Sequence, residues 1–394
     1  MSLPQIEEWI KEVEQRPESA ATILKLIAGR LQDLTERNEA LLAENIALQD
    51  GNRVEEYRKR IAHLEYQLDL LKRRYGLDAE ELAALPAEPA ILVPVCLLVY
   101  NAHGRILRVE PDSGTAALGH LNGELSPGGE PPRLLALPAN EELLLLFTSG
   151  RVSTCSVAEI PSQALGTALT WDQAALPDEP RAGERLACIT PLSWLSLADA
   201  FLQTSRRGCL KKTMTSIAET VFDSHFIGKG VVQKMDQPFD LMLCRGKDRL
   251  VMVTCEGRLV GLNVEDLSYS VEERLKLSPT DHLVASFVIC SEEVLICLTQ
   301  NGKIVYRDTS AIEFVNSTSS RGQALIPPTR LDKGVRFIGA ASAGKYNRVA
   351  ILDTAGDLNL HTLEELTSAG SVRTVHPLLA FSIVPASAGP GFTS

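Results

Sequence analysis

The stretch Leu295-Ile296-Cys297-Leu298-Thr299-Gln300-Asn301-Gly302-Lys303-Ile304-Val305-Tyr306 decides the fold of this chain. An apolar run ends in Thr299, the chain reaches Asn301-Gly302, and a second β-prone run follows. Asn-Gly pairs tolerate the positive φ angles of a tight turn, and apolar residues on both sides of such a pair are typical of a β-hairpin. The stretch therefore predicts two antiparallel strands joined at Gly302.

This hairpin pattern recurs along the chain. Six copies align on their turn glycines, which are Gly104, Gly150, Gly208, Gly257, Gly302 and Gly356. Successive glycines are 46, 58, 49, 45 and 54 residues apart. Repeats of about 40 to 50 residues with several strands each are typical of propeller blades. We therefore expect a six-bladed β-propeller over residues 91–394, with an irregular β-sandwich as the alternative.

A blade needs more strands than one hairpin supplies. Apolar runs precede several of the turn phrases, most clearly at residues 241–244, 283–290 and 335–340. We assign each run to the hairpin that follows it, which gives a blade three strands, and we expect a fourth strand after the turn.

Residues 1–75 have a helical pattern, with a short helix predicted over residues 3–16 and a seven-residue repeat over residues 20–75. The d positions of a coiled coil are Ile27, Leu34, Leu41 and Leu48, and the a positions are Leu24, Leu31, Asn38, Asn45 and Asn52. Asparagines at a positions pair across the axis of a two-stranded coil and favour a parallel, in-register dimer. The residues expected at the dimer interface are Ile27, Leu31, Leu34, Asn38, Leu41, Asn45 and Leu48. A helical hairpin with its corner at Gly51 is the alternative.

Residues 76–90 are expected to be a linker. The helical pattern ends at Gly76, and Pro86 and Pro89 prevent a helix and stiffen the chain before the first strand. The fold class predicted for the whole chain is an all-β six-bladed propeller preceded by an α-helical coiled coil.

The composition limits the classes of function. The net charge is −11, so attraction of the whole chain to nucleic acid or to an anionic membrane is not expected. The sequence has neither a run of about 18 apolar residues nor the start of a signal peptide, which favours a cytoplasmic protein without a membrane partner. The eight cysteines form no Cys-x-x-Cys pair, so we expect reduced core thiols, no metal site and no cofactor.

Two segments of the repeat resemble a known family. They are Phe201 to Thr213 (FLQTSRRGCLKKT), continued by Ile227 to Val232 (IGKGVV), and Ser319 to Ile326 (SSRGQALI). Both are similar to the C-terminal propeller of the DNA gyrase A subunit and its topoisomerase IV relative. That family presents basic residues on the outer rim and bends DNA around it.

The chain departs from this family in two respects. The family's box reads Gln-Arg-Arg-Gly-Gly-Lys-Gly, of which Gly228-Lys229-Gly230 remains here. We expect no breakage-reunion domain, because residues 1–75 are predicted to be coiled coil and Arg74-Tyr75 stands at the end of that coil. The resemblance therefore implies a protein that is not an enzyme.

Basic residues concentrate in one part of the predicted ring. Residues 206–258 contain ten basic and six acidic residues, and propeller blades follow one another in chain order, so this stretch would occupy one sector. The residues expected to contact the phosphates of double-stranded DNA are Arg206, Arg207, Lys211, Lys212, Lys229, Lys234, Lys247 and Arg258. The alternative is a protein–protein interaction scaffold whose propeller no longer wraps DNA. An enzyme with a site in the propeller channel would require polar residues that converge there.

The heptad pattern predicts that residues 1–80 form a dimer at micromolar concentration, which light scattering measures. Replacing Asn38 and Asn45 with Ile should raise the stability of the coil and blur its oligomeric state, because the buried asparagines set register at a cost in stability. A monomer would rule out the parallel coil.

Overall fold

A computed structural model describes residues 94–111, 116–163, 168–170, 175–289, 293–314, 320–327, 334–344 and 346–385, together with Gly29. The chain divides into two compact parts, Met1–Pro89 and Ala90–Ser394. The predicted coiled coil, its dimer interface and the linker at residues 76–90 lie outside the described residues and stay predictions.

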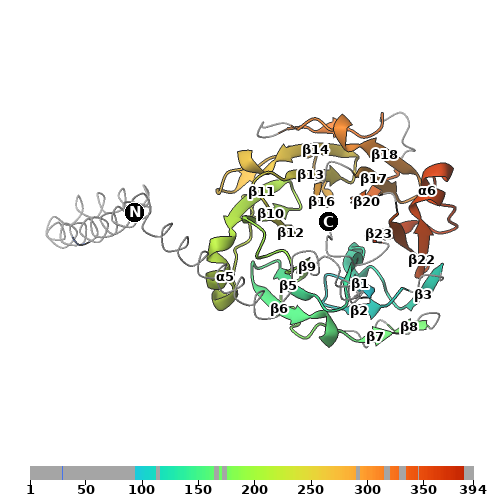
Figure 1. Ribbon diagram of the computed structural model, residues 1–394, viewed down its shortest axis with the longest axis horizontal. Coiled ribbons are helices and arrows are strands. Elements are labelled where there is room, and N and C mark those ends of the chain that lie inside the picture. Colours follow the sequence, from blue (N-terminus) through green and yellow to red (C-terminus); the bar gives the residue numbers. More distant parts are fainter. Residues whose placement is uncertain are drawn as a thin grey trace, which may run out of the picture. The chain divides into compact units, whose positions relative to one another are not determined.

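The second part forms a ring of six sheets, which confirms the predicted six-bladed propeller (Figure 1). We refer to its six repeats as units 1 to 6. Each predicted hairpin forms, with its glycine at the turn. The hairpins of units 1 to 6, numbered in chain order, are β1 (Val95–Tyr100) and β2 (Ile106–Val109), β5 (Glu142–Phe147) and β6 (Val152–Ser156), β10 (Ala200–Ser205) and β11 (Cys209–Met214), β13 (Arg249–Thr254) and β14 (Arg258–Asn263), β17 (Val294–Thr299) and β18 (Ile304–Asp308), and β21 (Arg348–Asp353) and β22 (Asp357–Thr362).

A third strand in each blade borders the centre of the ring. These inner strands are β4 (Arg133–Pro138), β9 (Leu186–Pro191), β12 (Pro238–Cys244), β16 (Leu283–Ile289), β20 (Phe337–Ala343) and β23 (Leu378–Val384). Each pairs antiparallel with the first strand of the hairpin that precedes it, as β12 does with β10. Our assignment of the runs at 241–244, 283–290 and 335–340 to the following hairpin was wrong, because the chain returns beside the hairpin it has just left.

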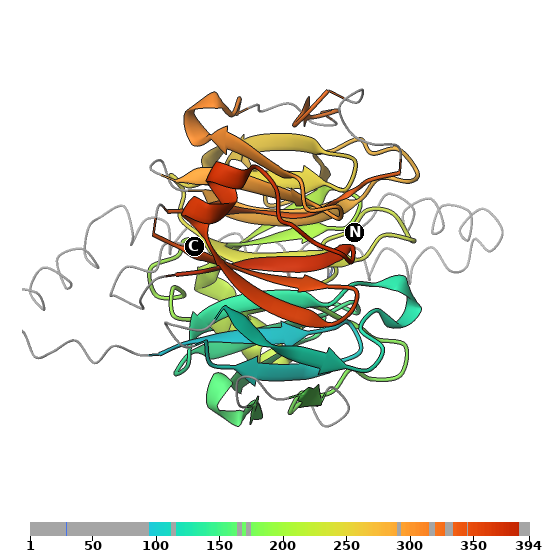
Figure 2. The same ribbon diagram turned by 90° about the vertical axis from the view of Figure 1, so that its right-hand side faces the viewer.

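The outer edge of each blade comes from the next unit. We call the stretch of chain between the hairpin and the inner strand of a unit its crossing segment. The segments that cross over include β7 (Ser162–Gln163) on β2, β15 (Glu272–Glu273) on β11 and β19 (Gln323–Ala324) on β14. In unit 1 the crossing strand is β3 (Ala117–Asn122), which pairs with β22 of unit 6 and closes the ring; β8 (Ala168–Thr170) then extends this sheet. Figure 2 shows the ring from its edge, with the red strands of unit 6 beside the first unit.

Every crossing segment docks on a turn glycine of the preceding unit. A backbone N–H of the crossing segment donates to the glycine carbonyl at 2.8–3.2 Å, and the six donors are Leu121, Leu176, Ile227, Leu275, Leu325 and Val372. All six donor residues are buried. The six glycines have φ between 76° and 98°, and a Cβ on any of them would lie closer than 3.0 Å to an atom of another unit. Glycine is therefore required at these turns for both conformation and contact.

The core consists of six apolar clusters, one between each pair of neighbouring blades. The first strand of each hairpin contributes to two clusters: Leu97 and Val99 of β1 face unit 6, whereas Cys96 and Leu98 face unit 2. Strands buried on both faces need continuous apolar runs rather than alternation, which explains runs such as residues 143–147.

Short helices connect strands of the ring. They are α5 (Ala218–Ser224), α6 (Leu363–Ala369) and the 3₁₀ turns η2 (Pro127–Gly129), η3 (Val157–Glu159), η5 (Thr215–Ile217), η6 (Val264–Asp266) and η7 (Thr309–Ala311). None of the helices in the described parts of the chain is long and apolar enough to span a membrane.

The docking contact predicts a large cost for Gly302→Ala. Gly302 has φ +82°, and a Cβ there would lie 2.5 Å from the Val372 carbonyl oxygen. Gly183 also has φ +82°, but its Cβ would meet nothing within 4 Å, so Gly183→Ala is a matched control. Denaturant unfolding of the full chain should give a loss of about 1 kcal/mol for the control and about 3 kcal/mol for Gly302→Ala. Equal losses would show that the docking contact contributes nothing.

Candidate nucleic-acid interface

Four of the eight predicted DNA-contacting side chains are exposed. Lys229 and Lys234 lie on the segment between α5 and β12, and Arg258 begins β14. Lys247 lies in the turn between β12 and β13. In the pairing of β12 with β10, Pro238 lies opposite Ser205, near Gly208, and Cys244 lies opposite Ala200 at the other end of the blade. The turn with Lys247 follows Cys244, so it lies at the end of the blade away from Gly208. The structure therefore places Lys229, Lys234 and Arg258 near the ends of the blades that carry the glycine turns, and Lys247 at the other end.

The other four predicted side chains bind groups of the protein itself. Arg206 donates from Nη1 to Glu130 Oε1 at 2.8 Å, and Arg207 donates from Nη1 to the carbonyls of Ser278 and Asp281. Arg206 also lies at the mouth of the central cavity rather than on the outer rim. Their guanidinium groups thus fasten neighbouring segments to the Gly208 turn.

Lys211 and Lys212 are held on the two faces of β11. Lys211 Nζ donates to the Ile227 carbonyl at 3.0 Å. Lys212 is buried, donates from Nζ to the Val264 carbonyl at 3.0 Å and lies 5.2 Å from the centre of the Tyr269 ring. Both ammonium groups donate hydrogen bonds to carbonyls of buried residues. The density of basic residues in the sequence therefore does not identify Lys211 and Lys212 as phosphate contacts.

The Gly228-Lys229-Gly230 segment is the crossing segment of unit 3. Ile227 N–H donates to the Gly150 carbonyl, and Gln203 Nε2 donates to the Gly228 carbonyl at 2.8 Å. Gly228 and Gly230 have φ of +88° and +63°, and a Cβ on Gly230 would lie 2.7 Å from the Gln203 side chain. The two glycines let this segment lie flat against blades 2 and 3, which leaves Lys229 exposed between them.

Other crossing segments also carry exposed cations within a few residues of the docked residue. Lys276 follows Leu275, Arg373 follows Val372, and Arg321 precedes Leu325 by four residues; all three are exposed. Sequence reasoning named none of the three as a DNA contact. Lys276 and Arg373 are identified by their position next to the apolar residue that docks on a turn glycine, and Arg321 by its place on a segment of the same kind.

In units 1 and 2, acidic residues follow the residue that docks on the turn glycine. Glu124 follows Leu121 by three residues, and Asp178 and Glu179 follow Leu176. Asp178 and Glu184 bind the buried guanidinium of Arg151, the basic residue of the second turn phrase. The crossing segments of units 3 to 6 therefore each present an exposed cation, whereas residues 91–205, which contain units 1 and 2, hold twelve acidic and six basic residues.

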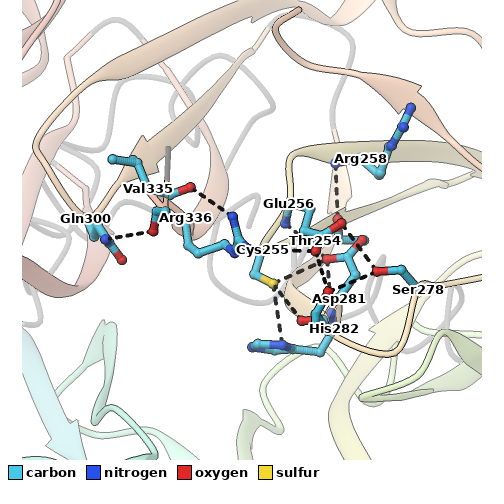
Figure 3. Close-up of polar contacts among 12 residues, drawn as sticks. Thr254, Cys255, Glu256, Arg258, Ser278, Asp281, His282, Gln300, Val335 and Arg336 are labelled. Atoms are coloured by element: carbon cyan, nitrogen blue, oxygen red, sulfur yellow. Dashed lines mark hydrogen bonds and ion pairs between the residues drawn. The ribbon is translucent and has the colours of Figure 1, made fainter. Parts of the chain in front are cut away.

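A polar cluster surrounds the Gly257 turn of unit 4 (Figure 3). Cys255 Sγ lies 3.4 Å from His282 Nδ1 and 3.3 Å from Asp281 Oδ1. This resembles a nucleophile with its base, but burial raises the pKa of the Cys255 thiol to about 12, so the thiol keeps its proton. Asp281 Oδ1 also accepts from the backbone N–H groups of Glu256 and His282 at 3.0 Å. The cluster holds the turn together.

Metal ligands do not gather in the described residues, where no three His, Cys, Asp or Glu side chains form a group that could hold an ion.

Comparison with solved structures identifies the fold. The DNA gyrase A C-terminal domain matches with a TM-score of 0.55 at 12% identity, covering 74% of this chain and 99% of that domain. The C-terminal domain of DNA topoisomerase IV matches with a TM-score of 0.49 at 17% identity, over 75% of this chain and 95% of that one. The E. coli ParC C-terminal domain matches with a TM-score of 0.35 at 12% identity, over 74% and 99%. No protein-family model and no curated protein matches the sequence. The described propeller thus has the fold of the gyrase A C-terminal domain, as the sequence resemblance predicted.

The Cys255 thiol predicts a dependence of stability on pH. Its folded pKa of about 12 is raised above the ordinary value of 9.0, so the stability it contributes is present below pH 9 and is lost as the pH rises toward 12. The free energy of unfolding, measured with urea, should therefore fall as the pH rises from about 9 toward about 12. Cys255→Ala should show a smaller fall, by the contribution of one proton. An identical fall in the variant would contradict the assignment.

Proposed function

We propose that the propeller binds the backbone of double-stranded DNA along the outer edge of units 3 to 6, as a non-catalytic architectural protein. The observation that carries this proposal is the set of exposed cations on the crossing segments, namely Lys229, Lys276, Arg321 and Arg373. Each projects from a segment that is fixed by a docked backbone hydrogen bond, so the spacing of the charges is set by the ring. Lysine and arginine at fixed spacing neutralise phosphates without reading bases.

Lys234 and Arg258 extend this edge. Arg258 pairs with Ala324 across β14 and β19, so it lies close to the segment that carries Arg321. Arg206, Arg207, Lys211 and Lys212 support the edge by holding the turns and crossing segments in place, and Lys247 lies outside it. The fold of the gyrase A C-terminal domain supports this role.

The coiled coil would add to this binding. A parallel dimer formed through residues 27–48 would carry two such edges, and two weak sites on one DNA gain affinity when both are engaged at once. With the acidic remainder of the ring turned away from the phosphates, DNA would contact one arc rather than wrap the whole propeller.

A protein partner is the second candidate, because exposed apolar side chains concentrate in unit 3. Phe226, Val232 and Met235 are 53%, 62% and 95% exposed on the segment between α5 and β12. Such a group of apolar side chains is typical of an interaction site, and it would suit the scaffold role.

Charge reversal tests the DNA proposal. Lys229→Glu with Lys276→Glu should weaken binding of the full chain to a DNA duplex, and should lower the slope of log affinity against log salt by about two between about 50 and 200 mM salt. Arg245→Glu with Lys247→Glu changes the net charge equally at the opposite end of the blades and should leave the slope unchanged.

The same assay separates the two candidates. Absence of a mobility shift at low salt would sink the DNA proposal. A stoichiometric protein partner that is retained after nuclease treatment would favour the scaffold.

A further inference from the structure

The six inner strands lie around the centre of the ring (Figure 1). Residues of these strands line a cavity of about 780 Å³. Cavities of about 300–1,000 Å³ with apolar walls and a few convergent polar groups are the usual sites for small ligands. All six units contribute residues to the lining.

The end of the cavity next to the glycine turns carries a group of cations. Arg185 and Arg206 both donate from Nη1 to the same oxygen, Glu130 Oε1, at 3.0 and 2.8 Å. Two guanidinium groups against one carboxylate leave a net positive charge. Each guanidinium has five N–H donors, and these contacts use one donor of each. The side chains of Arg185 and Arg206 are 45% and 30% exposed, so the remaining donors are open to a ligand.

A third arginine in the wall is already satisfied. Arg133 Nη1 donates to the carbonyls of Ala187 and Phe239, and its Nη2 donates to Asp240 Oδ1 at 2.7 Å. The Phe239 ring lies 4.8 Å from the guanidinium. Arg133 thus joins the inner strands of units 1, 2 and 3 and leaves the recognition of an anion to Arg185 and Arg206.

The opposite wall is apolar near the glycine turns, and Glu293, Ser342 and Ser382 line it farther from them. Ile338 on β20 and Leu379 and Phe381 on β23 line the cavity and are half-buried. The small residues Gly339, Ala340 and Ala341 on β20 provide the width of the cavity at this side. A ligand with a charged head at the arginines would therefore rest its body on apolar side chains.

We propose that the central cavity binds an organic anion, with its oxyanion head on Arg185 and Arg206 and its apolar body against β20 and β23. A phosphate, sulfonate or carboxylate accepts the open guanidinium donors through charge-assisted hydrogen bonds and balances the excess charge beside Glu130. The apolar wall then removes the body of the ligand from water. This site is separate from the outer edge proposed to bind DNA, and its test uses different residues.

The test uses 8-anilino-1-naphthalenesulfonate, which joins a sulfonate to aromatic rings and fluoresces in apolar surroundings. Titration of the full chain should show saturable binding of one probe per chain. Arg206→Ala and Arg185→Ala should each weaken binding about tenfold or more, the scale expected for a charge-assisted hydrogen bond. Arg206→Lys should retain part of the affinity.

Further variants locate the probe. Ala341→Phe should fill the cavity and abolish binding, whereas Arg245→Ala, which removes a 58% exposed arginine paired with Asp248 at the far end of blade 3, should not change it. Circular dichroism and the unfolding midpoint check that each variant is folded. If Ala341→Phe does not fold, the comparison of Arg206→Ala with Arg206→Lys still decides.

Competition identifies the head group. Displacement of the probe by adenosine monophosphate would indicate a phosphate ligand, and displacement by laurate a carboxylate. Binding that does not saturate, that the arginine variants leave unchanged, or that neither competitor displaces would overturn the proposal.

Discussion

One backbone hydrogen bond, repeated six times, holds the ring together: the N–H of a buried residue in each crossing segment donates to the turn-glycine carbonyl of the preceding unit. Because the glycine has no Cβ, the crossing segment approaches the turn more closely than any side chain would permit. The same contact covers the edge of each sheet, which would otherwise expose unpaired backbone groups to other chains. Strand β3 of unit 1 pairs with β22 of unit 6 and closes the ring. Each blade therefore receives its outer edge from the next unit.

Most of this architecture could be predicted from the sequence, because the hairpins are local. Gly104 to Gly356 mark turns whose strands are adjacent in the chain, and the runs beside them are apolar because neighbouring blades cover both faces. The assignment of the inner strands could not be predicted in the same way. The run at residues 241–244 lies between two hairpins, and only pairing with β10 shows to which blade it belongs. The coiled coil of residues 1–75 stays a prediction.

The candidate interface was less predictable than the fold, because a count of charges does not distinguish a free cation from one that holds a carbonyl. Lys211 and Lys212 belong to a sheet strand with protein on both faces, and their ammonium groups bind the carbonyls of Ile227 and Val264. Lys229 differs because the flanking glycines hold its backbone flat and leave its side chain exposed. Lys276 and Arg373 became candidates only when the crossing segments were aligned by their docked residues.

The docked segments combine structure and recognition in the same few residues. Ile227 fixes the backbone to Gly150, and Lys229, two residues later, presents a charge at a position that this hydrogen bond determines. A change at Ile227 would therefore disturb both the ring and the charge, whereas a change at Lys229 alters the charge alone. The outer edge and the central cavity of the propeller show the same separation between residues that fix the backbone and residues that present charge. Apolar residues between blades fix the crossing segments, the outer edge carries cations beyond them, and the inner strands leave Arg185 and Arg206 at the mouth of the cavity.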